Sequence, residues 1–192
     1  MGIYSNMLDL VDLSCKSTGI KIEGCNMCEL GDQFMCGFDD DPSVPKIAKT
    51  YFENIGVKHT SIDIGGQNGS LKLNLSKPLN DFSNYFDLIT NYGTSEHVSD
   101  QYNLFLNIHN FVRVGGAIIN VAPLVGSWQD HPCFFFYESD FFNILSEKNE
   151  YKIIYNEIKY NEKKGGIISS SNKLICNVAV KKYQSDFVSR SD

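Results

Sequence analysis

Hydrophobic positions along the first two thirds of the chain alternate between a helical and a strand-like spacing. In residues 46–55 apolar side chains recur every three or four positions before Gly56, which predicts an amphipathic helix that ends at a glycine. Residues 100–112 have the same spacing and predict a second helix, ended by Gly115 and Gly116. Short apolar runs bounded by turn residues predict five strands, at residues 24–31, 59–64, 70–75, 85–90 and 117–122. This alternation is typical of a parallel sheet with helices on both faces.

The pattern changes after the fifth predicted strand. Residues 151–160 and 173–183 are both strand-like and flank a turn-rich segment at residues 163–166, which predicts an antiparallel hairpin. We therefore predict a single α/β domain over residues 1–192, a Rossmann-like three-layer α/β/α sandwich. Its sheet is expected to be mostly parallel and to end in the antiparallel hairpin.

Three segments around this framework are predicted to be less regular. Residues 5–14 have apolar positions compatible with a short helix packed on one edge. Residues 35–45 contain three aspartates and two prolines, which neither a helix nor a strand tolerates in its interior, so a loop is predicted there. Residues 184–192 are expected to form a frayed tail.

Composition and charge narrow the class of protein. The chain is 42% hydrophobic and 12% aromatic, which favours a packed globular domain over a disordered chain. Its formal net charge of -6 opposes nonspecific binding to nucleic acid, which needs clustered lysine and arginine. No apolar run is long enough to span a bilayer and residues 1–10 do not resemble a secretion signal, so a cytoplasmic protein without membrane association is predicted.

The six cysteines and the acidic run do not match known metal-binding spacings. Cys25 and Cys28 are separated by two residues, but no second pair completes a four-ligand zinc site, so buried thiols are predicted. The aspartates at residues 39–41 lack the alternation and distal glutamate of a calcium loop. We therefore predict no metal site.

Candidate binding residues follow the ends of the predicted strands. In an open parallel sheet, ligands bind beyond the carboxyl ends of the strands. A carboxylate after the second strand, Asp63, is positioned to accept hydrogen bonds from the two hydroxyls of a ribose, although it could instead cap the turn at Gly65 and Gly66. The predicted cofactor-binding residues are Glu29, Gly31, Asp32, Gln33, Asp63, Ile64, Asn74, Leu75, Asn91 and Gly93.

The turn after the first strand argues against a dinucleotide cofactor. A dinucleotide-binding turn needs three glycines so that the backbone can approach a pyrophosphate, and only Gly31 is present, followed by the carboxylate of Asp32. S-adenosylmethionine has no phosphate and carries a positive sulfonium. It therefore suits a pocket that contains the carboxylates of Glu29, Asp32, Asp63 and Glu96.

The same strand-end series resembles a known family. Together with residues 86–89 and the Val-Arg-Val-Gly-Gly at residues 112–116, it is similar to the class I S-adenosylmethionine-dependent methyltransferases, over residues 25–183. The resemblance implies that the acid after the second strand, Asp63, binds the ribose and that Asn74 contacts adenine, where an aspartate is common. It also implies that the first turn lies under the methionine moiety and that the turn after the fourth strand lines the methyl-transfer site. The single glycine of the first turn and the insertion at residues 35–45 depart from the family pattern.

Candidate catalytic residues lie in two segments, residues 91–98 and 126–132, which resemble a branch of small methyltransferase-like proteins. Glu96, His97 and His131 are predicted to be catalytic, because an imidazole with a pKa near neutrality suits the deprotonation of an alcohol or phenol. Two alternatives remain open: His97 could cap the next helix, and the aromatic residues that follow His131 could be core packing. Trp128 is expected to form part of the acceptor wall.

These observations favour one function and leave one alternative. The chain is predicted to transfer a methyl group from S-adenosylmethionine to a small molecule, glycan or peptide, with O-methylation favoured over transfer to nitrogen. The alternative is a noncatalytic methyltransferase-like module that binds a nucleoside or a protein partner. The unusual first turn is the observation that suggests this alternative.

Overall fold

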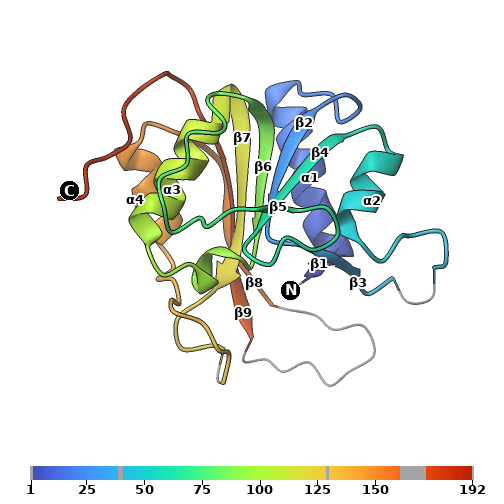
Figure 1. The fold of residues 1–192 in the computed structure, drawn as a ribbon. Helices are drawn as coiled ribbons and strands as arrows, with labels where there is room; N and C mark the ends of the chain where they lie inside the picture. The colour runs from blue at the N-terminus through green and yellow to red at the C-terminus, as the bar shows by residue number, and fades with distance from the viewer. Residues whose placement is uncertain (1, 39–40, 129, 161–171, 192) are drawn as a thin grey trace.

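A seven-stranded sheet forms the centre of the computed structural model, which describes residues 2–38, 41–128, 130–160 and 172–191 (Figure 1). The strand order is β5-β4-β2-β6-β7-β9-β8, and all neighbours are parallel except that β9 is antiparallel to both β7 and β8. The strands are β2 (Asn26–Leu30), β4 (Lys58–Asp63), β5 (Leu71–Lys72), β6 (Phe86–Tyr92), β7 (Val112–Pro123), β8 (Lys152–Tyr160) and β9 (Lys173–Val180). The predicted sheet is confirmed, and the turn predicted at residues 163–166 lies outside the described residues.

Helices cover both faces of this sheet, so the predicted three-layer α/β fold is confirmed. They are α1 (Ser5–Thr18), α2 (Ala48–Asn54), α3 (Gln101–Phe111) and α4 (Phe141–Lys148), with a 3-10 turn η1 (Ser95–His97). Figure 1 shows α1 and α2 on one side and α3 and α4 on the other. Adjacent residues of β6 point to opposite cores: Leu88 lies in the cluster that includes α1 and α2, and Ile89 in the cluster that includes α3 and α4. None of the described helices combines the length and apolar character needed to cross a bilayer.

Several elements differ from the sequence prediction. The first helix is longer and ends at Gly19, which has a left-handed backbone (φ 76°). The strand predicted at residues 70–75 is reduced to β5. Four elements were not predicted: α4, η1, and the short strands β1 (Gly2–Tyr4) and β3 (Phe34–Cys36), which pair in parallel as a separate two-stranded sheet. The loop predicted at residues 35–45 therefore begins with a strand.

The C-terminal segment packs on α3 instead of fraying. The ring centroid of Phe187 lies 5.6 Å from that of Tyr102 and 5.5 Å from that of His109. The guanidinium of Arg190 lies 4.9 Å from the ring centroid of Tyr102. The prediction of a frayed tail is thus wrong for residues 184–191, because α3 presents aromatic side chains that the tail covers.

Candidate functional site

A cavity of about 550 Å³ lies beyond the carboxyl ends of β2, β4, β5 and β6. We call it the strand-end cavity. Nine of the residues predicted from the sequence line it: Gly31, Asp32, Gln33, Asp63, Ile64, Asn74, Leu75, Gly93 and His97. Seven further residues line it that the sequence did not single out: Ile62, Leu73, Ser76, Thr94, Val98, Ser99 and Phe134. Most of these seven are adjacent in the sequence to predicted residues, whereas Phe134 belongs to a separate loop.

The backbone and the neighbours of the turn after β2 both favour glycine at position 31. Gly31 has a φ of 83°, in the left-handed region that side chains rarely adopt. A Cβ atom here would lie 2.6 Å from Thr94 Oγ1 and 2.8 Å from Gln33 Nε2. Those two atoms form a bridge, since Gln33 Nε2 donates to Thr94 Oγ1 (3.0 Å) and Thr94 Oγ1 donates to the carbonyl of Leu30 (2.6 Å). The bridge joins the turns after β2 and β6 at the cavity wall.

Asp63 is the last residue of β4. Its side chain caps the following turn, as the alternative interpretation of the sequence expected, and it also lines the cavity. Its Oδ1 accepts a hydrogen bond from the backbone N–H of Gly65 (2.6 Å), and its Oδ2 accepts one from the N–H of Asp32 (3.2 Å). The side chain is half-buried. Because a carboxylate can accept about four hydrogen bonds, Asp63 retains capacity for two hydroxyl donors.

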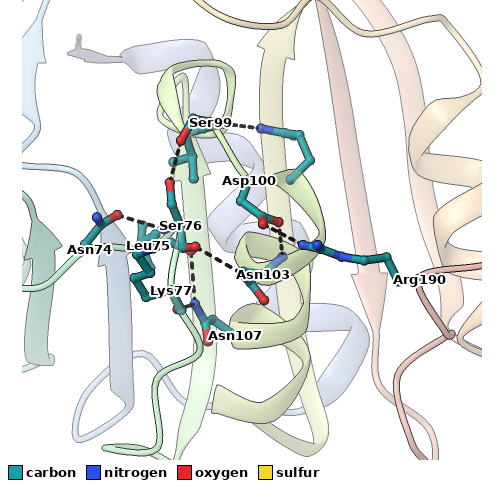
Figure 2. Close-up of polar contacts among 11 residues, drawn as sticks. Asn74, Leu75, Ser76, Lys77, Ser99, Asp100, Asn103, Asn107 and Arg190 are labelled. Atoms are coloured by element: carbon teal, nitrogen blue, oxygen red, sulfur yellow. Dashed lines mark hydrogen bonds and ion pairs between the residues drawn. The ribbon is translucent and has the colours of Figure 1, made fainter.

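The segment after β5 forms another part of the cavity wall, and α3 holds it in place (Figure 2). Asn74 Oδ1 accepts from the N–H of Ser76 (2.9 Å), which closes a tight turn at the wall. The carbonyl of Ser76 accepts from Asn103 Nδ2 (3.0 Å). The fully buried Asn107 donates to the carbonyls of Leu75 (3.1 Å) and of residue 77 (2.8 Å). It also accepts from the N–H of residue 79 (2.9 Å).

Asn107→Ala is expected to lower the free energy of unfolding by about 3 kcal/mol, because three backbone groups, one buried and two partly buried, would lose their partner. Asn103→Ala is the matched control: it is only half-buried and its side chain donates to one carbonyl, so a loss of about 1 kcal/mol is expected. Urea unfolding of both variants measures the difference. Equal losses would contradict the assignment of Asn107 as the main attachment of this wall.

Two predicted residues lie behind the cavity wall instead of in it. Asn91 is buried, and its Oδ1 accepts from the backbone N–H groups of Thr94 (3.4 Å) and Ser95 (3.0 Å). Glu29 is buried too, with Oε1 accepting from the N–H of Gln33 (3.3 Å) and Oε2 at 3.6 Å from Nε2 of His59. Both side chains support the turns that form the wall.

The three predicted catalytic residues come together from η1 and from the loop after β7. The carboxylate of Glu96 has no solvent exposure, and neither of its oxygens has a hydrogen-bond partner among the described residues. His131 Nε2 lies 3.9 Å from Glu96 Oε1, and the rings of His97 and His131 are 5.1 Å apart. The backbone N–H groups of Phe134 and Phe135 donate to the carbonyl of Glu96 (2.8 and 3.2 Å), which fixes the loop over η1.

Burial dominates the protonation of this cluster. It raises the pKa of Glu96 to about 7. Burial lowers the pKa of His97, and the neighbouring His131 lowers it further, whereas a hydrogen bond with the carbonyl of Pro132 opposes this change. Burial also lowers the pKa of His131. Both imidazoles are therefore neutral at pH 7.

A second cavity, of about 460 Å³, adjoins the first at Gly93, which lines both. We call it the aromatic cavity. It is lined by aromatic side chains of β1, β3, β6 and the loop after β7: Tyr4, Phe34, Tyr92 and Trp128. The indole of Trp128 donates to the carbonyl of Lys173 (2.6 Å), and its ring lies 5.5 Å from that of His131. The sequence placed His131 and Trp128 in the acceptor wall, and of these two Trp128 lines this cavity.

Comparison with known proteins identifies the fold. No sequence-family model and no curated protein sequence matches the chain. Solved structures match it well. An S-adenosylmethionine-dependent methyltransferase from Methanosarcina mazei gives a TM-score of 0.62 at 13% identity, covering 96% of this chain and 100% of that one. A 1,6-didemethyltoxoflavin-N1-methyltransferase from Burkholderia thailandensis, with bound 1,6-didemethyltoxoflavin and S-adenosylhomocysteine, gives 0.61 at 13% identity, covering 93% of this chain and 79% of that one.

A third neighbour also contains the product of the cofactor. The N-methyltransferase NodS from Bradyrhizobium japonicum, in complex with S-adenosylhomocysteine, gives a TM-score of 0.59 at 13% identity, covering 90% of this chain and 84% of that one. The chain therefore has the class I S-adenosylmethionine-dependent methyltransferase fold, and the resemblance noted in the sequence is confirmed at the level of the fold.

Proposed function

We propose that the chain binds S-adenosylmethionine in the strand-end cavity and transfers its methyl group to a hydroxyl of a small molecule in the aromatic cavity. The junction of the two cavities at Gly93 is the observation that supports this most. A methyl donor and its acceptor must meet in line, and two adjoining cavities allow this. The volume of the strand-end cavity, about 550 Å³, is in the range of small-molecule sites.

The cofactor is expected to lie with its nucleoside between β4 and the segment after β5. Asp63 would accept hydrogen bonds from the two ribose hydroxyls, and the wall formed by Asn74 and Leu75 would contact adenine. The methionine moiety would then lie over the turn at Gly31, toward Gly93. The carboxylate of Asp32, in the same wall, would attract the positive end of this ligand.

The aromatic cavity favours a planar, largely apolar acceptor over a glycan or a peptide. Its walls offer ring faces and few polar groups, and Tyr92 is buried in its floor. Its volume of about 460 Å³ is in the range of small-molecule sites.

Transfer to oxygen needs a group that takes up the hydroxyl proton. A lone pair of the acceptor oxygen attacks the methyl carbon, the sulfur–carbon bond breaks, and its electron pair stays on sulfur to give S-adenosylhomocysteine. The proton of the hydroxyl passes to the neutral imidazole of His97 or His131, and the carboxylate of Glu96 stabilises the resulting charge. This cluster is the reason that O-methylation is favoured.

Calorimetry with S-adenosylhomocysteine, followed by mass spectrometry of reactions with S-adenosylmethionine, tests the proposal. We expect micromolar binding, and methylation of hydroxylated aromatic compounds but not of matched amines, oligosaccharides or peptides. Absence of binding would contradict the cofactor assignment. Binding without turnover, unchanged in His97→Ala, would favour the noncatalytic module, for which the single glycine of the first turn is the supporting observation.

A further inference from the structure

The cluster of Glu96, His97 and His131 has the composition and spacing of a metal site. One ligand atom from each residue, a carboxylate oxygen and two imidazole nitrogens, lies within 4.8 Å of the other two. One ion at the centre of such a triangle can bind all three after small side-chain rotations, since metal–ligand bonds are about 2.0–2.2 Å. The residues come from two segments that are distant in sequence, which explains why no metal motif was visible.

The state of Glu96 supplies a second, independent reason. A buried carboxylate without a hydrogen-bond donor is costly unless it is protonated or paired with a cation. Both oxygens of Glu96 are in this position, and the only cationic candidate within 4 Å among the described residues is His131 at 3.9 Å. Imidazole nitrogens are common metal ligands, and a bound cation would pair with this carboxylate.

We propose that Glu96, His97 and His131 bind a single divalent transition-metal ion, with zinc as the best match. Two imidazoles and one carboxylate form the ligand set of many catalytic zinc sites, which keep a fourth position open. Magnesium and calcium prefer oxygen ligands and match this set less well.

The position of the ion gives it a role in the proposed reaction. His97 lines the strand-end cavity, and His131 contacts Trp128 of the aromatic cavity. An ion between them would bind the acceptor oxygen and lower the pKa of its hydroxyl, so that the proton passes to solvent water and not to an imidazole, whose nitrogen the ion would occupy. This role rests on the proposed function, whereas the metal binding itself does not.

Metal binding can be measured without any methyl acceptor. The protein is freed of metal by dialysis against a chelator, then titrated with Zn²⁺ in competition with a chromophoric chelator and with Co²⁺ by visible absorption. We expect the protein to bind one equivalent of Zn²⁺. Co²⁺ is expected to give the visible absorption bands of a site with nitrogen and oxygen ligands and a low coordination number. Glu96→Gln and His131→Ala are each expected to weaken Zn²⁺ binding by roughly 100-fold or more, because even the loss of an outer partner costs 10–100-fold.

Three control variants separate this site from incidental metal binding. Glu138→Gln removes an exposed carboxylate of the same loop, Cys133→Ser removes a neighbouring thiol, and His109→Gln removes a histidine on α3; each should bind Zn²⁺ as the parent does. His131 lies in a loop, so His131→Ala is expected to fold. It therefore keeps the test valid if Glu96→Gln fails to fold. Loss of binding in Cys133→Ser, or equal binding in His131→Ala, would overturn the proposed ligand set.

Calorimetry with S-adenosylhomocysteine on the same samples distinguishes the two proposals. Binding of S-adenosylhomocysteine without a stoichiometric Zn²⁺ site would overturn the metal proposal and leave the methyltransferase proposal intact. A Zn²⁺ site that requires Glu96 and His131, in a protein that does not bind S-adenosylhomocysteine, would support the metal site and contradict the cofactor assignment.

Discussion

Asp63→Ala is expected to weaken the binding of S-adenosylhomocysteine by roughly 100-fold, equivalent to about 3 kcal/mol. Asp63 lies at the carboxyl end of β4 in the wall of the strand-end cavity. There its carboxylate can accept from both ribose hydroxyls while it keeps its bonds to the backbone. Two hydrogen bonds to a charged group contribute about 1.5–3 kcal/mol each, so even the lower value gives this loss. Isothermal titration calorimetry of the variant and its parent measures the change.

Part of that loss could come from the turns that Asp63 supports, and two variants separate the effects. Asp63→Asn keeps the shape and one acceptor oxygen, so its affinity should lie between those of the parent and Asp63→Ala. Asp9→Ala removes an exposed carboxylate on α1 and should change neither affinity nor stability. The free energy of unfolding, measured in urea for each variant, corrects for general loosening. Unchanged affinity in Asp63→Ala would leave Asp63 only the turn-capping role at Gly65.

The centre of the sheet was predictable because its strands are buried. Every residue of β6 except Asp87 is buried, and the turn residue Gly93 follows the strand. The weakest strand prediction was the one at residues 70–75, where only the two exposed residues of β5 pair with the sheet. An edge strand buries little surface, so its sequence carries a weaker signal.

The elements that escaped prediction depend on contacts between distant segments. β1 and β3 have three residues each, too few to show a periodicity, and they form because Gly2–Tyr4 pairs with Phe34–Cys36 across the chain. Their pairing builds one wall of the aromatic cavity, which was therefore missing from the sequence-based site. Similarly, the packing of residues 184–191 depends on the aromatic face of α3 and not on the tail's own pattern.

The candidate site was predictable where chain geometry alone determines it. The carboxyl ends of parallel strands meet at one edge of the sheet, so Gly31, Asp63 and Gly93 line one cavity as the sequence order suggested. Sequence order could not distinguish side chains that face the cavity from side chains that lie behind its wall, such as that of Asn91. Nor could it reveal that the loop carrying His131 is fixed over Glu96 by backbone hydrogen bonds.

Gly31→Ala is expected to abolish measurable binding of S-adenosylhomocysteine and to lower the free energy of unfolding by about 2–4 kcal/mol. The left-handed backbone at this position costs about 1–2 kcal/mol with a side chain, and the added Cβ would displace Thr94 Oγ1 and Gln33 Nε2. Losing the hydrogen bonds of that bridge adds about 1 kcal/mol each. The turn would then move at the position where the methionine moiety is expected to bind.

Gly24→Ala provides a control with nearly the same backbone strain. Gly24 has a φ of 81°, and a Cβ atom there would meet nothing within 4 Å. It precedes β2 at the end opposite Gly31, away from the strand-end cavity. Gly24→Ala should therefore lose about 1–2 kcal/mol of stability and bind S-adenosylhomocysteine as the parent does. If both variants lost affinity equally, the effect would reflect general destabilisation, and the turn at Gly31 would have no specific part in binding the cofactor.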